Sequence, residues 1–524
     1  MSKGPLAAVT VVALAAVLAH APGLGNGYVW DDADIVLGAY DGGAPRPWTE
    51  ILLAPDANAS DPRSPYYRPL ARATVALDRA LLGDAPAPRH AESVALHAVA
   101  AVLALLLLRR LLGDHRIALV AALLFAIHPV QAEAVNELAA RNTLLAAALA
   151  LAALLAHATW RERGGWWRAA LCGGCYFLGL AAKETAAPII LVAAILEDVR
   201  PTSSVHSWRS RLSGLASFAV ALAVYLPLRW TALGGLAPSH GGGAPLQLRL
   251  LQQLWIVPRY LATAAWPVGL DAARRVPPQA LSAWWIAPVW IAILAAVAWI
   301  VRRGTRAARF GLLFFVAAYL PVGGLIAIPS VPIAERHVYL AALGLWVIAA
   351  DRLVALGEKR PLRRFALPAG AAIGLLLAGM SARRAADFHD ELTFWRSVLA
   401  VDPDYWLALV CFGNALHERG DLAGAEAAWT AAVRANPNDG TAWNQLGNLA
   451  FRRGDLAGAE RAFASAAAFR PDLFEHVYNH ALALDALGRA DDARAELARA
   501  RAILPPHRAA LAAQIDARLA RATP

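Results

Sequence analysis

Long apolar segments alternate with short charged ones from the N-terminus to about residue 382. Each apolar segment is rich in Ala, Leu and Val and approaches the roughly 20 residues that a helix needs to cross a bilayer. The pattern predicts about eleven membrane-spanning helices, near 5–22, 92–112, 117–134, 142–158, 168–182, 185–198, 212–230, 284–301, 310–328, 337–355 and 365–382. Further on, charged residues are evenly spread. We therefore predict an all-α protein with a polytopic membrane domain at 1–383 and a second domain at 384–524.

The composition excludes an ordinary soluble protein. Hydrophobic residues make up 58% of the chain, against about 45–50% in soluble proteins. A formal charge of +10 is compatible with nucleic-acid binding, but most arginines lie in short clusters between the apolar segments. Basic residues in that position orient membrane helices, with the basic loops in the cytoplasm. We therefore expect membrane lipid, and no nucleic acid, as a partner.

The basic loops predict a topology. With a cytoplasmic N-terminus, every strongly basic short loop lies in the cytoplasm, provided that residues 250–268 do not cross the membrane. That segment contains two glutamines, an arginine and two prolines, so an interfacial or re-entrant helix is expected. The loop at 23–91, the turns at 128–141 and 330–336 and the C-terminal domain then face outward. The first apolar segment also fits a cleaved signal peptide.

Two other motifs are interpreted as structural. Cys172 and Cys175, in the sequence CGGC, lie inside an apolar segment with no second ligand pair nearby. We predict that they pack a helix and form neither a disulfide nor a metal site. The glycine-rich stretch at 234–245 lacks the GK[ST] of a phosphate-binding loop, so we expect a flexible outer loop there.

Prolines recur at one fixed interval in the second domain, at Pro403, Pro437, Pro471 and Pro505. This interval is the period of the tetratricopeptide repeat (TPR). Small residues and one aromatic recur at the same phase: Gly413, Gly420, Ala425, Trp429 and Ala432, then Gly447, Gly454, Ala459, Phe463 and Ala466. We predict a TPR α-solenoid, with a half repeat near 384–405 and repeats near 406–439, 440–473 and 474–507. Such an array either binds a peptide, a protein or a sugar, or only packs against the membrane domain.

Charged residues gather in the outward loops, each group at the edge of an apolar segment. Asp31 and Asp32 follow Trp30 shortly after the first segment, where an acidic pair is either a helix N-cap or a general base. The other ionisable members are Arg68, His128, Glu133, Glu137, Arg141, Lys183, Glu184, Glu335, Arg336, His337 and Tyr339. Snorkelling or pairing at helix ends explains any single one of them.

Together these groups predict one site. An ionisable side chain costs roughly 2.5–3.5 kcal/mol at mid-bilayer, so charges kept at several helix ends on one face suggest use or pairing. Arginine and lysine hold an anionic phosphate leaving group. A carboxylate beside them removes the proton of an acceptor hydroxyl. The pattern therefore predicts a cationic phosphate pocket next to an acidic base.

Six short motifs, in this order, resemble the transmembrane and TPR-containing O-mannosyltransferase-like family and its bacterial relatives. They are WDD at 30–32, YRPL at 67–70, HPVQAEAV at 128–135, RNTLL at 141–145, AKE at 182–184 and AERHVYL at 334–340, followed by the repeats. The resemblance implies a GT-C glycosyltransferase fold with an uncleaved first segment. It also implies transfer of a sugar, mannose or another hexose, from a polyprenyl-phosphate donor to a protein hydroxyl or envelope acceptor on the extracytoplasmic face.

The resemblance also implies roles for the residues. Asp31 and Asp32 are the catalytic candidates, unranked. Arg68, Arg141, Lys183 and Arg336 would bind the donor phosphate or lipid head, whereas Trp30, His128, Glu133, Glu184, Glu335 and Tyr339 would shape the sugar or acceptor site. No resident cofactor is expected, and metal dependence stays open, because Gln131 and Asn142 stand where animal members tend to have His and Asp.

Other functions remain as alternatives. A non-catalytic, membrane-anchored TPR scaffold for envelope or polysaccharide assembly would leave the outward aspartates dispensable. A transporter would carry ionisable or helix-breaking residues near mid-span in paired halves, and these segments are mostly Ala, Leu and Val. A lipid-linked oligosaccharide ligase or polymerase would differ only in its acceptor. The Ala/Arg-rich usage is typical of a high-GC bacterium, and therefore predicts the inner membrane and an undecaprenyl carrier.

Overall fold

The computed structural model describes residues 3–32, 35–36, 47–55, 66–199, 208–235, 245–277, 280–325, 333–504 and 508–521. Over these ranges it is helical, with no strand apart from one isolated antiparallel bridge between Arg274 and Ile333. The all-α prediction is confirmed. Parts of the loop at 23–91, most of the loop at 234–245 and Pro505 lie outside the described residues. The chain forms two compact units, Met1–Asp390 and Glu391–Pro524.

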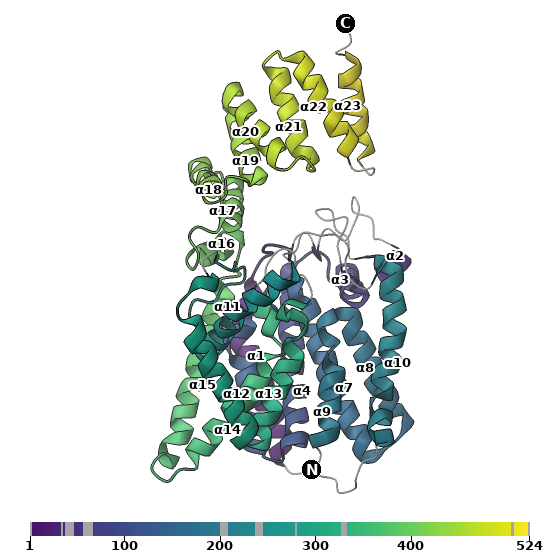
Figure 1. Ribbon diagram of the computed structural model, residues 1–524, viewed down its shortest axis with the longest axis vertical. Coiled ribbons are helices and arrows are strands. Elements are labelled where there is room, and N and C mark those ends of the chain that lie inside the picture. The colour runs from purple at the N-terminus through teal and green to yellow at the C-terminus, as the bar shows by residue number, and fades with distance from the viewer. Residues whose placement is uncertain are drawn as a thin grey trace. The chain divides into compact units, whose positions relative to one another are not determined.

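The first unit is a bundle of helices that run side by side (Figure 1). The N-terminus lies at the lower end in this view, and α2, α3 and α11 lie at the upper end. The helices are α1 (Lys3–His20), α2 (Trp48–Leu53), α3 (Pro69–Leu82), α4 (Pro86–Leu112), α5 (His115–Ile127), α6 (Ala132–Asn136), α7 (Arg141–Arg163), α8 (Trp166–Ala182), α9 (Ile189–Val199), α10 (Trp208–Leu233), α11 (Leu246–Ala265), α12 (Ile286–Arg303), α13 (Arg306–Tyr319), α14 (Ala342–Gly357) and α15 (Arg363–Ala386).

Six helical stretches of the described chain are long and apolar enough to cross a membrane: Leu6–Gly25, Pro86–Leu112, Leu138–Arg163, Leu212–Leu233, Ile286–Arg303 and Arg363–Ala386. The helices His115–Ile127 and Pro129–Asn136 form a pair bent by 53°. If this pair counts as one span, the described chain has up to seven. The protein is therefore a multi-pass membrane protein. The α11 helix, which contains most of the segment expected to lie at the interface, is not among these spans.

The number of helices long enough to cross the membrane is lower than the eleven predicted, because several apolar segments form shorter helices. The predicted spans at 168–182, 185–198, 310–328 and 337–355 correspond to α8, α9, α13 and α14, of 17, 11, 14 and 16 residues. Polar or bending residues interrupt them. Lys183 ends α8 in extended backbone, and a kink at Gly323 and Gly324 follows α13.

Small residues let the membrane helices approach closely. Gly311 of α13 faces Gly344 of α14, and a Cβ atom added at Gly344 would overlap the Gly311 carbonyl oxygen. Close backbone approach at small residues is the usual way in which helices pair in lipid, where apolar burial gives no drive. Cys172 is buried in α8, and the Ser217 hydroxyl of α10 donates to its sulfur over 3.4 Å. Its role in the structure is thus one of helix packing.

The second unit repeats one pair of helices. After α16 (Glu391–Leu399) come α17 (Trp406–Glu418), α18 (Leu422–Ala435), α19 (Gly440–Arg452), α20 (Leu456–Phe469), α21 (Phe474–Ala486), α22 (Ala490–Ile503) and α23 (Ala509–Arg521). The first helices of the three pairs begin at Trp406, Gly440 and Phe474, which are evenly spaced at the interval of the prolines. Gly420, Gly454 and Gly488 turn the chain within each pair at positive φ, where glycine is favoured.

Local sequence explains each pair. Asp421 accepts a hydrogen bond from the Gly424 N–H over 2.8 Å, which caps the start of α18. Trp429 is 2% exposed and packs where Gly413 leaves no side chain, because a Cβ atom at Gly413 would overlap the indole ring. Gly447 and Phe463 repeat this contact in the next pair. An aromatic residue on one helix therefore requires a glycine on its partner.

Candidate functional site

The segment after the first membrane helix holds Asp32 rigidly. Its carboxylate is fully buried and accepts two backbone hydrogen bonds, from the Ala139 N–H over 2.7 Å and from the Val29 N–H over 3.1 Å. Burial, together with the nearby Glu137 carboxylate, raises the pKa of Asp32 well above its usual value. Asp32 therefore fixes this segment to the chain that precedes α7.

Asp31 has a different environment. It is only partly buried, and its charge is among those that raise the pKa of Arg336. The residue before it, Trp30, has φ of +52° and is the only non-glycine with positive φ among the described residues. Such a strained backbone persists only where its surroundings hold it, and it is common at functional sites. The Arg336 guanidinium lies 5.0 Å from the centre of the Trp30 ring, a cation–π distance.

Arg336 is the centre of a buried charge network. Its backbone N–H donates to Glu133 Oε2 over 3.1 Å, and Nη1 donates to Glu137 Oε2 over 2.6 Å and to Glu133 Oε1. Burial alone would lower the pKa of Arg336, but the carboxylates of Glu137 and Glu133 raise it above its usual value. The network joins α6 to the short helix at Glu335–Val338. Glu137, to which the sequence motifs assign no role, is an equal member of it.

Two further cations come from other segments. Arg68, just before α3, binds Glu184 with both ends of its guanidinium, Nη2 to Oε1 over 2.7 Å and Nε to Oε2 over 3.3 Å. Lys183 is buried, and its Nζ donates to Thr143 Oγ1 over 2.7 Å. Burial and the Arg68 charge lower the pKa of Lys183 to about 7. The lysine is therefore poised between its charged and neutral forms near neutral pH.

His337 follows Arg336 in the short helix and is affected by the charges of all three cations. Its pKa is lowered well below its usual value, first by burial and then by the charges of Arg336, Lys183 and Arg68. One neutral imidazole is therefore within electrostatic reach of Arg336, Lys183 and Arg68, although these residues are far apart in the sequence. Sequence reasoning assigned no role to His337, although the AERH motif contains it. Arg336 and Arg68 are paired with the carboxylates of Glu133, Glu137 and Glu184, so an anion at this site would compete with these carboxylates for the cations.

Three predicted site residues have structural contacts. Arg141 pairs with Asp78 and, through Nη2, with Glu92 over 3.0 Å. His128 caps the following turn through Nδ1, 3.2 Å from the Val130 N–H, and its ring lies 4.2 Å from that of Trp346. The Tyr339 hydroxyl is 2.7 Å from His97 Nδ1.

Glu335 belongs to a neighbouring ion-pair group. It accepts a hydrogen bond from Arg384 Nη2 over 3.3 Å and another from the Asp271 backbone N–H. Asp271 and Arg384 lie outside the short motifs, so no sequence signal pointed to them. The described residues contain no group of three or more His, Cys, Asp or Glu side chains that could hold a metal ion.

Comparison with known proteins agrees with this class of membrane protein. Residues 67–230 match the family model of dolichyl-phosphate-mannose-protein mannosyltransferases. The protein O-mannosyl-transferase Tmtc1 of Drosophila melanogaster is 30% identical over 203 residues, which cover 37% of this chain and 23% of that protein. The protein O-mannosyl-transferase F38B6.6 of Caenorhabditis elegans is 24% identical over 426 residues, 77% of this chain and 59% of the relative.

The fold and the charged site define a polytopic α-helical membrane protein with acids and cations gathered from separate segments. These matches confirm that the chain is similar to O-mannosyltransferases of the PMT and TMTC type. The chain spans less than two thirds of the length of these relatives.

Proposed function

We propose that this protein is an integral-membrane, GT-C-type glycosyltransferase. It takes mannose or another hexose from a polyprenyl-phosphate donor and transfers the sugar to a hydroxyl of a protein or envelope acceptor on the extracytoplasmic face. The similarity to named O-mannosyl-transferases supports a membrane glycosyltransferase. The observation that carries the proposal is the cation–π contact of Arg336 with Trp30, the residue that precedes Asp31, over 5.0 Å. The charges of Arg336, Lys183 and Arg68 all act on His337.

The proposed reaction uses the two sides of this site. Asp31 accepts the proton of the acceptor hydroxyl as that oxygen attacks the anomeric carbon. The bond between the anomeric carbon and the phosphate oxygen breaks, and polyprenyl phosphate leaves with the electron pair. Arg336, Lys183 and Arg68 stabilise its negative charge. Trp30 and Glu133 hold Arg336 in position, while Asp32 fixes the backbone that presents Asp31.

The second unit completes the proposal. We assign its helix pairs to the TPR class, because they recur at the TPR period with a glycine opposite an aromatic side chain in two of them. On the predicted topology, this unit and the charged site both face the extracytoplasmic side of a bacterial inner membrane. The array is then available to an acceptor.

A turnover assay tests this function. The full chain, purified in detergent, is incubated with synthetic polyprenyl-phosphate mannose or glucose and with a Ser/Thr-containing peptide, and released polyprenyl phosphate is measured. We expect the wild-type protein to release it from at least one donor. Absence of release from both donors, with the protein folded, would contradict the proposal and favour a scaffold. Release that survives loss of Asp31 and of Arg336 would place the site elsewhere.

The pH profile reports on Lys183. With its pKa at about 7, Lys183 loses its positive charge as the pH rises through 7, so the attraction for the donor phosphate weakens. We expect kcat/KM for the donor to fall about tenfold between pH 6 and pH 9. The Lys183→Arg variant stays charged over this range, and its profile should lack that decline. An identical decline in both proteins would assign the titration to another group.

A further inference from the structure

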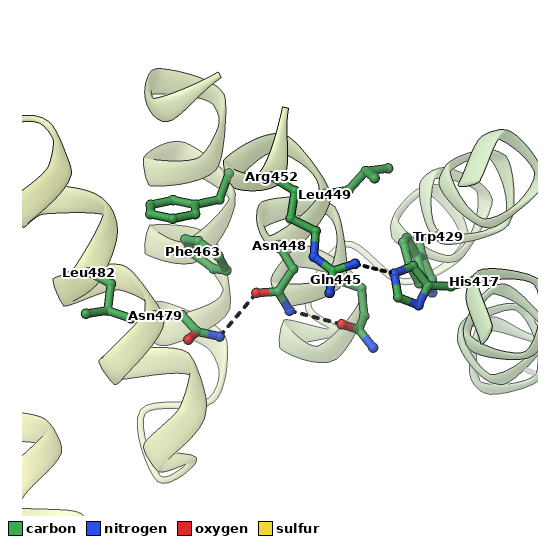
Figure 2. Close-up of a pocket in the computed structure, with 10 residues that line it drawn as sticks. His417, Trp429, Gln445, Asn448, Leu449, Arg452, Phe463, Asn479 and Leu482 are labelled. Atoms are coloured by element: carbon green, nitrogen blue, oxygen red, sulfur yellow. Dashed lines mark hydrogen bonds between the residues drawn. The ribbon is translucent and has the colours of Figure 1, made fainter. Parts of the chain in front are cut away.

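A pocket of about 360 Å³ in the second unit is lined by α17, α19 and α21, the first helices of the three pairs, with contributions from α18 and α20. Figure 2 shows Gln445, Asn448 and Asn479 side by side along it. Arg452 Nη1 lies 3.0 Å from His417 Nε2 at the same pocket. The polar lining thus consists mainly of primary amides, and the reaction proposed above uses none of them.

The amides form a chain of hydrogen bonds with one direction. Gln445 Nε2 donates to Asn414 Oδ1 over 2.8 Å, Asn448 Nδ2 donates to Gln445 Oε1 over 3.2 Å, and Asn479 Nδ2 donates to Asn448 Oδ1 over 3.5 Å. Asn479 Nδ2 also lies 2.9 Å from Asn444 Oδ1. We call these five residues the amide ladder. The ladder crosses all three helix pairs.

The ladder follows the repeat. Asn414 and Asn448 are one repeat apart, as are Gln445 and Asn479, so each pair occupies one position of successive repeats. Within α19, Gln445 and Asn448 are three residues apart and therefore lie on the same face, one turn from each other. A surface that repeats with the helix pairs suits a ligand that is itself a linear repeat.

The chemistry of a primary amide indicates which linear repeat. Each such side chain has two N–H donors and a carbonyl oxygen with two lone pairs. Asn479 Nδ2 donates two bonds, and Asn414 Oδ1 accepts a second one from Trp429 Nε1 over 3.1 Å. The bonds of the ladder still leave each side chain a donor or an acceptor for a ligand. A backbone peptide group presents one N–H and one C=O. Only an extended segment leaves these groups open, because a helix or a sheet pairs its own. The ladder therefore complements an extended polypeptide.

The rest of the lining favours a polypeptide over a glycan. Sugars bind to open aromatic faces. Of the three aromatic side chains named in the lining, Trp429 and Phe463 are each 2% exposed, and Phe451, at 36%, offers a partly open face. The amides Gln445, Asn448 and Asn479 are neutral, so the charge in the lining comes from Arg452, which lies against His417. Leu449 and Leu482 add apolar contacts that suit side chains of any sequence.

We propose that the amide ladder binds an extended polypeptide segment through its backbone amides, with little dependence on side-chain sequence. This inference deepens the proposed function and rests on it in one respect, since the bound segment would be part of the acceptor. Binding is nevertheless measurable without donor or transfer, so the two proposals can fail separately.

Fluorescence anisotropy on the full chain in detergent tests the ladder. The probe is a fluorescein-labelled peptide of Ser, Thr, Ala and Gly, compared with a scrambled sequence and with a version N-methylated at alternate backbone nitrogens. We expect the affinity of the scrambled peptide to lie within about threefold of that of the original peptide. The N-methylated peptide should bind about tenfold or more weakly, because it lacks the backbone N–H groups that would donate to the amide oxygens. The double variant Asn448→Ala/Asn479→Ala should weaken the ordinary peptide by a similar factor.

Matched controls make the result decisive. Gln514→Ala removes an exposed amide of α23, outside the pocket, and should bind like wild type. Asn448→Asp keeps the side-chain size but loses the donor, so it tests the ladder if the double variant is poorly folded. Equal binding of the N-methylated peptide, no loss in either ladder variant, tighter binding of a soluble mannan than of the peptide, or no peptide binding by wild type would each overturn the inference. Peptide binding without sugar transfer would leave it standing and count against the proposed function alone.

Discussion

Replacing Asp31 with Asn is expected to reduce sugar transfer by at least about 100-fold, because a positioned general base contributes roughly 10²–10⁴-fold to proton transfer. The substitution keeps the size of the side chain and leaves the hydrogen bonds of Asp32 in place. Thermal unfolding in detergent should therefore change little. The measurement is the rate of polyprenyl-phosphate release, with donor binding measured separately to show that the loss lies in kcat.

The neighbouring aspartate provides the contrast. Asp32→Asn places an N–H donor against one of two backbone N–H groups, so we expect lower stability, of about 1–3 kcal/mol, together with reduced activity. Asp84→Asn is the matched control, because this carboxylate is 56% exposed and pairs with Arg79 over 3.1 Å. If Asp31→Asn turned over at the wild-type rate while Asp32→Asn was folded and inactive, the assigned roles would be reversed.

Arg336→Ala is expected to lose both stability and activity. The side chain of Glu133 is 0% exposed and that of Glu137 is 2% exposed, and both bind Arg336. Removing one partner of a buried ion pair costs about 3–5 kcal/mol, because the remaining charge is left uncompensated. The phosphate site also loses a cation. We expect a marked drop in apparent Tm and in donor affinity.

Two other variants separate the effects on stability and activity. Arg336→Lys keeps a charge but lacks the guanidinium fork, so it should fold better than the Ala variant while donor binding stays weak. Arg116→Ala removes an arginine that is 62% exposed and pairs with Asp114 and Glu358, and it should change Tm little, since exposed pairs contribute about 0–1 kcal/mol. An Arg336→Ala protein with wild-type Tm would show that Glu133 and Glu137 do not depend on this cation.

The sequence predicted the all-α class well because apolar length and helical periodicity are local properties. It overestimated the long spans because hydropathy does not reveal where a helix is interrupted. Lys183 and the Gly323–Gly324 kink shorten helices in segments that are apolar on both sides. In the second unit, the helix pairs recur at the same interval as the prolines, so the repeat was readable from local sequence.

The candidate site was predictable as a set of segments but not as a set of contacts. Motifs led to Asp31 and Asp32, yet the buried state of Asp32 depends on the Ala139 N–H, 107 residues away. Arg141 was expected to bind phosphate, and its link to Asp78 and Glu92 could not be read from its position. His337 was named with Glu335, Arg336 and Tyr339 in one group but received no role, because a lone histidine beside charged residues gives no pattern. These features depend on contacts between residues that are far apart in the chain, and such contacts cannot be predicted from the local pattern of a single sequence.

The contact between Gly311 and Gly344 also restrains the helix that follows Arg336. Gly344 is eight residues after Arg336, and its Cα meets the opposing backbone with no room for a side chain. Advancing α14 by one residue along its own screw, about 1.5 Å with a rotation of roughly 100°, would bring Leu343 or Leu345 against Gly311, which the close approach forbids. The register between α13 and α14, and with it the start of the chain that leads from Arg336 into α14, thus depends on the absence of two side chains.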